Sequence, residues 1–255
     1  TLHIIGFAKI VDDITAASIE VAAFFAISLL LTSLLLWGYI GSLKLAMMPM
    51  FCAIVAVIWE LGFLRSIGFG LDPFAILVPF LVLAVSVSHG VQYVNAWAGE
   101  VMRGANSYQA SLATFRRLAI PGTVALITDV VGFATIYLIN IAVIREMSVN
   151  AAFGIFAIIA TNKLMMPALL TFMRVGNLER FKAAQQKRDE IGNRIWRQLA
   201  KVTRRGPAIG VLVVYALLLG WALTMLPKLT IGDTGEGVPE LRPDSRFNID
   251  ARQIS

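Results

Sequence analysis

The stretch from Pro73 to Trp97, "PFAILVPFLVLAVSVSHGVQYVNAW", decides the fold. It is long enough to cross a hydrocarbon core of roughly 30 Å as a helix of about 20 residues. Asp72 supplies an N-cap acid before it, and proline suits the first helical position. Polar groups are costly at membrane depth unless they have a partner, and such groups tend to be functional. The polar residues near the end of this stretch therefore predict a site: Ser88, His89 and Gln92.

The composition of the whole chain is that of a membrane protein. Of its 255 residues, 58% are hydrophobic and only 15% are charged, and the mean hydropathy is +0.75. A soluble domain carries roughly 25% charged residues. Five further apolar segments are long enough to span a bilayer, so the sequence predicts an all-α membrane protein with a six-helix bundle. The expected spans are residues 19–40, 45–64, 73–97, 120–140, 147–173 and 207–227.

The basic residues predict how these spans are oriented. Fourteen lysines and arginines fall on one side of the six spans and seven on the other. The positive-inside rule places the richer side in the cytoplasm, so both chain ends are expected outside it. This distribution explains the net charge of +6 without a nucleic-acid partner. Residues 174–206 predict an amphipathic linker on the anionic cytoplasmic leaflet, with a plain solvated connector as the alternative.

Polar groups from three expected spans share one depth. His89 lies eight residues before Trp97, and Asp129 lies eight residues after Pro121. At 1.5 Å per residue, both lie roughly 12 Å from the cytoplasmic side. Five further residues complete this polar belt: Ser88, Gln92, Thr128, Asn162 and Lys163.

A histidine and a carboxylate in one bundle can carry a proton, because histidine titrates near neutral pH. His89 and Asp129 are therefore the predicted proton-coupling residues. The alternative is that the polar belt only joins helix to helix, at about 0.6 kcal/mol for each hydrogen bond. Pro79 and Pro167 interrupt the third and fifth spans and are predicted hinges. Glu60 is expected near the outer surface, as an anchor.

Several chemical motifs are missing from the sequence. It contains no Walker phosphate loop, no HExxH and no GxSxG, and its two histidines are too few for a zinc site. Ser88 and His89 are adjacent, so on a helix they point about 100° apart, which is poor geometry for a serine nucleophile and its base. We therefore expect no catalytic residue, metal or cofactor, and the proton motive force as the energy source.

Three stretches carry a resemblance to a known family: "DPFAILVPFLVLAVSVSHGVQYVNAW", "FRRLAIPGTVALITDVVGFATIYLINIAVIREM" and "GVPELRPDSRFNID". They resemble the resistance–nodulation–division (RND) superfamily, and within it the bacterial permeases grouped with the mycobacterial large membrane proteins (MMPL) and hopanoid exporters. The resemblance covers nearly the whole chain. It implies twelve transmembrane helices in two repeats, each with a large external domain after its first helix. The chain would then be a fragment covering the second to seventh helices.

The resemblance also implies a division of the chain. Residues 1–17 would end the first extracytoplasmic domain, and 18–173 would form a five-helix bundle like a sterol-sensing domain. The linker 174–206 would lead to the span 207–227, the first helix of the second repeat, and 228–255 would open the second extracytoplasmic domain. The family usually places acidic coupling residues where this chain has Ser88 and His89. Asp129, one helix later, supplies a carboxylate at matching depth.

The function implied by the resemblance is secondary active transport in the bacterial inner membrane. The transporter would export lipids or other hydrophobic compounds and use the proton gradient. Its expected partners are the lipid bilayer, a hydrophobic substrate and the second repeat of the full-length chain. A homo-oligomer is also allowed, because trimers and monomers both occur among relatives. The alternative function is a non-pumping module that binds or senses lipid or sterol.

Overall fold

The computed structural model describes residues 7–70, 72, 75–173, 179, 183, 196–229 and 248–249, with side chains from Glu20 onward. The described residues form helices and short connections. The long α-helices are α1 (Phe7–Ile40), α2 (Leu43–Ser66), α3 (Val78–Met102), α4 (Ser107–Ile136), α5 (Ala142–Ile159) and α8 (Arg205–Met225). Shorter segments are η1 (Ala75–Leu77), η2 (Ala160–Met165), α6 (Met166–Thr171), η3 (Ala200–Thr203) and η4 (Leu226–Lys228).

Six helices are long and apolar enough to cross a membrane. The all-α, six-span architecture expected from the sequence is therefore confirmed. The fourth helix begins at Ser107, well before the expected residue 120, because Asn106 caps it. The Asn106 side chain accepts a hydrogen bond from the Gln109 backbone N–H at 2.9 Å, and the Asn106 N–H donates to the Gln109 side chain at 3.2 Å. This reciprocal capping box fixes the helix start.

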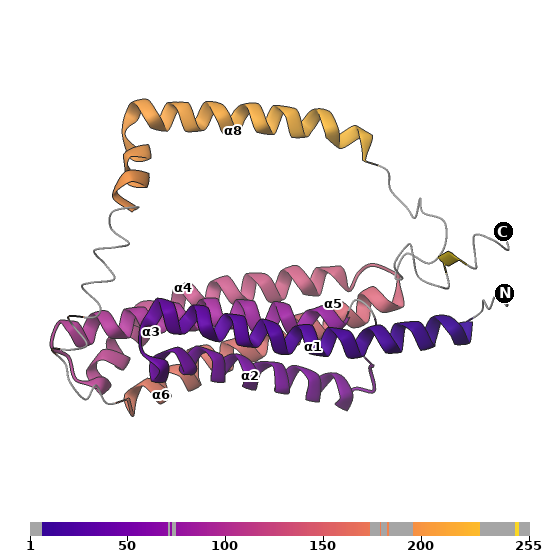
Figure 1. The fold of residues 1–255 in the computed structure, drawn as a ribbon, viewed down its shortest axis with the longest axis horizontal. Coiled ribbons are helices and arrows are strands. Elements are labelled where there is room, and N and C mark those ends of the chain that lie inside the picture. Colours follow the sequence, from indigo (N-terminus) through magenta and orange to yellow (C-terminus); the bar gives the residue numbers. More distant parts are fainter. Residues whose placement is uncertain are drawn as a thin grey trace. The chain divides into compact units, whose positions relative to one another are not determined.

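The chain divides into two compact units. One unit, Val11–Gly176, holds the bundle of α1 to α6 (Figure 1). The other contains α8, flanked by η3 and η4. The predicted linker 174–206 and the second predicted external segment, 228–255, lie largely outside the described residues. The described part of the first segment, residues 7–17, is helical and continuous with α1.

The core of the bundle lies between α2, α3 and α5. On α3 the buried residues recur at helical spacing and include Val82, Ser86, Gly90, Tyr93 and Trp97. Phe63 of α2 stacks on Phe153 of α5, with ring centroids 3.7 Å apart. Few of the described side chains of α1 and α4 are buried, and many of the exposed ones are apolar, as on lipid-facing helices.

One end of the bundle, here called the basic end, is where α1, α3 and α6 finish and α2 and α4 begin. Trp97 is fully buried there, and its indole N–H donates to the Ser107 carbonyl oxygen at 3.2 Å. The Ser107 hydroxyl donates to the Met173 carbonyl oxygen, which ties α4 to the end of α6. Four exposed basic residues mark this end: Lys44, Arg103, Arg116 and Arg117.

Candidate functional site

The site begins with an irregular turn in the fifth span. Residues Ala160–Met165 form a π-helix between α5 and α6, and the Met166 N–H donates to the Thr161 carbonyl oxygen. Pro167 follows directly, has no N–H to donate and would crowd the carbonyl four residues earlier. Widening the preceding turn accommodates the proline, and such π segments are frequent at functional sites. This one carries Asn162 and Lys163, both buried.

Lys163 is the centre of the site. Its side chain is only 4% exposed, and its Nζ lies 3.5 Å from Nδ1 of His89 on α3. The same Nζ lies 4.9 Å from the ring centroid of Tyr93, one turn further along α3. An aromatic face attracts an ammonium group, and the attraction is stronger away from water. Two cations at 3.5 Å repel each other, so His89 and Lys163 compete for protons.

Gly122 of α4 provides the space for this amine. A Cβ atom at Gly122 would lie 2.1 Å from the Nζ of Lys163 and 3.7 Å from the Nδ1 of His89. Any side chain there would occupy the position of the ammonium group. The glycine therefore lets α4 form the third wall around the amine.

Asn162 joins the same two helices beside the lysine. Its Nδ2 donates to the hydroxyl oxygen of Ser86 at 2.7 Å, and both residues are fully buried. Its Oδ1 has no hydrogen-bond partner among the described residues. A Cβ at Gly90 would lie 3.1 Å from this oxygen, so the helices approach closely here. We call the group of Ser86, His89, Tyr93, Asn162 and Lys163 the Lys163 cluster.

Asp129 lies at the edge of this cluster. It is exposed on α4, and like Lys163 it interacts electrostatically with His89. Its spacing from Gly122 and Leu126 places the three residues on one stripe of the helix. Within the described part of the chain, no hydrogen bond or ion pair joins Asp129 to His89.

The other residues predicted for the polar belt lie outside the cluster. Ser88 and Gln92 are exposed on α3, and the Thr128 hydroxyl donates to the Val124 carbonyl oxygen of its own helix at 2.9 Å. Pro79 occupies the first turn of α3, which begins at Val78, and so does not interrupt the α-helix. Pro167 lies in the first turn of α6, directly after the π-helix.

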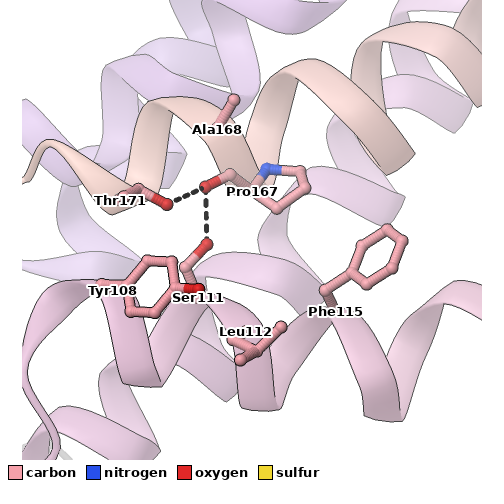
Figure 2. A pocket seen from close by; sticks show the side chains of 7 residues that line it. All are labelled: Tyr108, Ser111, Leu112, Phe115, Pro167, Ala168 and Thr171. Carbon is pink, nitrogen blue, oxygen red and sulfur yellow. Dashed lines mark hydrogen bonds between the residues drawn. The ribbon is translucent and has the colours of Figure 1, made fainter.

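A small pocket lies between α4 and α6 toward the basic end, with a volume of about 170 Å³. The hydroxyls of Ser111 and Thr171 both donate to the Pro167 carbonyl oxygen, at 2.5 and 2.9 Å (Figure 2). The Ser111 bond holds α4 against the turn that follows the π-helix, whereas the Thr171 bond lies within α6. The rest of the lining is mainly apolar: Tyr108, Leu112, Phe115 and Ala168.

Sequence reasoning missed several members of the site. Ser86 and Tyr93 lie three residues before and four after His89, so helical spacing around the histidine was the available signal. Glu60 is not a surface anchor as expected, because it is fully buried. Asn150 of α5, also fully buried, lies beside it. No sequence signal marked that pairing.

Two comparisons bear on the family of this chain. A family model described as Patched SSD matches residues 18–172, more than half of the chain. No curated protein matches this chain significantly. The matched residues run from the start of the first span to the end of α6 and include the whole Lys163 cluster. The chain is thus a multi-pass membrane protein of the Patched sterol-sensing-domain family, a module of RND-like membrane proteins.

Proposed function

We propose that this chain is part of a proton-driven RND-type transporter that exports lipids or other hydrophobic compounds. The observation that carries the proposal is a buried lysine amine 3.5 Å from a histidine nitrogen within a membrane-spanning bundle. Ionisable groups at such depth are rare and usually belong to ion pathways or proton relays. His89 and Lys163 would hold the proton, and Asp129 would balance the charge. We place the transporter in a bacterial inner membrane with its basic end in the cytoplasm.

The coupling step follows from the repulsion between two cations. Proton uptake by His89 beside a charged Lys163 drives the two groups apart, and loss of the proton lets them approach again. Lys163 belongs to the π-helix, so its displacement acts on the turn that joins α5 to α6. A change of charge next to a bistable packing element is a sufficient switch. Movement of α6 would then pass to other parts of the transporter.

The second candidate function is a non-pumping module that binds or senses sterol or another lipid. The match to a sterol-sensing domain and the open apolar pocket beside Pro167 favour it. Such a module needs the same bundle, but it does not need a titrating pair. The two functions therefore differ in what happens when His89 and Lys163 are neutralised.

The test uses the complete protein in liposomes that enclose a pH-sensitive dye. Proton flux and extrusion of a fluorescent lipid are measured for the wild type, His89→Ala, Lys163→Met and Asp129→Asn. We expect His89→Ala and Lys163→Met to lower coupled flux at least about tenfold, since positioned proton carriers contribute that much or more. Asp129→Asn should lower it less, because Asp129 acts from the edge of the cluster.

Ser88→Ala is the matched control, because Ser88 adjoins His89 but is exposed outside the cluster. It should transport like the wild type. If His89→Ala and Lys163→Met remain folded and keep full proton flux, the cluster only joins helices and the proton-driven function is wrong. If the wild type and all variants bind the fluorescent lipid but none of them shows proton flux, the sensing module is favoured.

A further inference from the structure

A second buried polar pair lies toward the other end of the bundle. Glu60 of α2 and Asn150 of α5 are both fully buried, and their side chains lie beside each other. Gly154, one turn beyond Asn150, makes room for the acid. A Cβ there would lie 3.3 Å from Cγ of Glu60 and 2.4 Å from Cγ2 of Val82 on α3. The carboxyl group is thus enclosed by α2, α3 and α5.

The polar atoms of this pair lack partners. Both carboxyl oxygens of Glu60 and both amide atoms of Asn150 make no hydrogen bond of good geometry to any described group. No charged group on the neighbouring elements forms an ion pair with Glu60 in the described part of the chain. The basic groups there are Arg65, His89, Arg145 and Lys163, whereas Asp72 and Glu146 are acids and cannot form an ion pair with a carboxylate.

The missing partners bear on the chemical form of Glu60. An ionised carboxylate has no donor of its own, so next to Asn150 it can only accept from Nδ2 and leaves the amide oxygen unpaired. It would also leave a buried charge uncompensated, which is costly in an apolar interior. A protonated acid can donate its O–H to Oδ1 of Asn150 and accept from Nδ2. A small side-chain rotation would then give two hydrogen bonds between neutral groups.

We propose that Glu60 and Asn150 form a second proton-binding site of the transporter, which exchanges its proton during transport. The role of this site in transport rests on the proposed function. The claim that Glu60 binds a proton at neutral pH does not depend on that function. Positions on α3 link the two sites. Val82 packs at the Glu60 pair, Ser86 lies one turn further on and His89 follows, so the two sites are roughly 10 Å apart along the helix.

Infrared spectroscopy of the complete protein in liposomes tests the bound proton directly. We expect the carbonyl band of a buried carboxylic acid at neutral pH, shifted when H₂O is replaced by D₂O. The band should disappear in Glu60→Gln and change frequency in Asn150→Leu. Glu146→Gln is the matched control, because Glu146 is a half-buried carboxyl on α5, the helix that also carries Asn150. Its spectrum should keep the band.

If the wild-type spectrum contains no carbonyl band that is lost in Glu60→Gln, the proposal is overturned, because Glu60 would then be ionised. A band that does not shift in D₂O would also overturn it, because the proton would be sealed in. If Glu60→Gln does not fold, the D₂O shift in the wild type and the frequency change in Asn150→Leu decide the question.

Proton flux in the same liposomes tests whether the site belongs to the transport cycle. Glu60→Gln should lower coupled flux at least about tenfold, while Glu146→Gln transports normally. Flux equal to wild type in Glu60→Gln would remove the site from the cycle and overturn that part of the proposal. If the wild type itself carries no proton flux, the proposed function fails, and the infrared result still decides whether Glu60 binds a proton.

Discussion

The two buried polar sites of the bundle differ in what surrounds their ionisable group. The Lys163 amine has a histidine nitrogen at 3.5 Å and an aromatic ring at 4.9 Å. The Glu60 carboxyl has a single neutral amide beside it and no hydrogen bond of good geometry to a described group. A charge can persist in the first setting, because the aromatic ring and the nitrogen of a neutral histidine stabilise an ammonium group. In the second, the neutral acid is the form that its neighbour can satisfy.

Both sites also depend on a glycine of a neighbouring helix, but in different ways. Gly122 faces the far end of the flexible Lys163 side chain, at 2.1 Å from a built Cβ. Gly154 faces Val82, a branched and fully buried residue, at 2.4 Å. The same substitution at the two positions therefore separates a functional need for space from a structural one.

The largest effect on stability is expected for Gly154→Ala. Val82 is fully buried and lies 2.4 Å from the built Cβ, so the added methyl group pushes α3 and α5 apart and should lower the free energy of unfolding by about 1–3 kcal/mol. Denaturant unfolding in detergent measures this. Gly132→Ala is the control, because nothing lies within 4 Å of its built Cβ, and it should be neutral or stabilising by about 0.5–1 kcal/mol. Equal stability of both variants would show that α3 and α5 approach less closely.

A smaller effect is expected for Ser86→Ala, which tests the composition of the Lys163 cluster. The Asn162 amide loses its acceptor, and its Oδ1 is already without a partner among the described residues. Hydrogen bonds between membrane helices contribute about 0.6 kcal/mol on average and up to about 1.7. We therefore expect Ser86→Ala to lower the free energy of unfolding by about that amount. Ser88→Ala should change the free energy of unfolding by less than about 0.5 kcal/mol, since that hydroxyl is exposed. The opposite order would place Ser88, as the sequence suggested, in the buried network.

The fold could be predicted because the bilayer imposes the length and polarity of each span. The six spans followed from apolar runs alone, whereas the start of α4 depended on the local cap at Asn106. The level of the site along the helices could also be predicted, since the rise of about 1.5 Å per residue converts position into distance. This reasoning predicts His89, Asp129 and Asn162 at one level with Lys163 beside them, and the structure brings His89, Asn162 and Lys163 together.

Which side of each helix faces inward was harder to predict. Ser88 is a polar residue at the level of His89 and is therefore predicted for the site, whereas Ser86 is the serine that lies on the buried stripe. Glu60 lies within two turns of the end of α2, where an exposed anchor is the ordinary outcome. Its burial depends on Asn150 and Gly154, which come from a helix distant in sequence, and no local pattern records that packing.

The smallest effect on stability and a clear effect on function are expected for Gly122→Ala. The new methyl group takes the place of the Lys163 ammonium. Because the ammonium lies at the end of a flexible side chain, it can move aside, and the free energy of unfolding should change by less than about 0.5 kcal/mol. The amine then leaves His89, and proton flux in liposomes should fall and lose its dependence on Lys163. Adding Lys163→Met to Gly122→Ala should cause no further loss of proton flux, whereas the same substitution in the wild type lowers the flux strongly. Normal flux in Gly122→Ala would show that the proximity of Lys163 to His89 is not required, and the two buried sites would then differ only in packing.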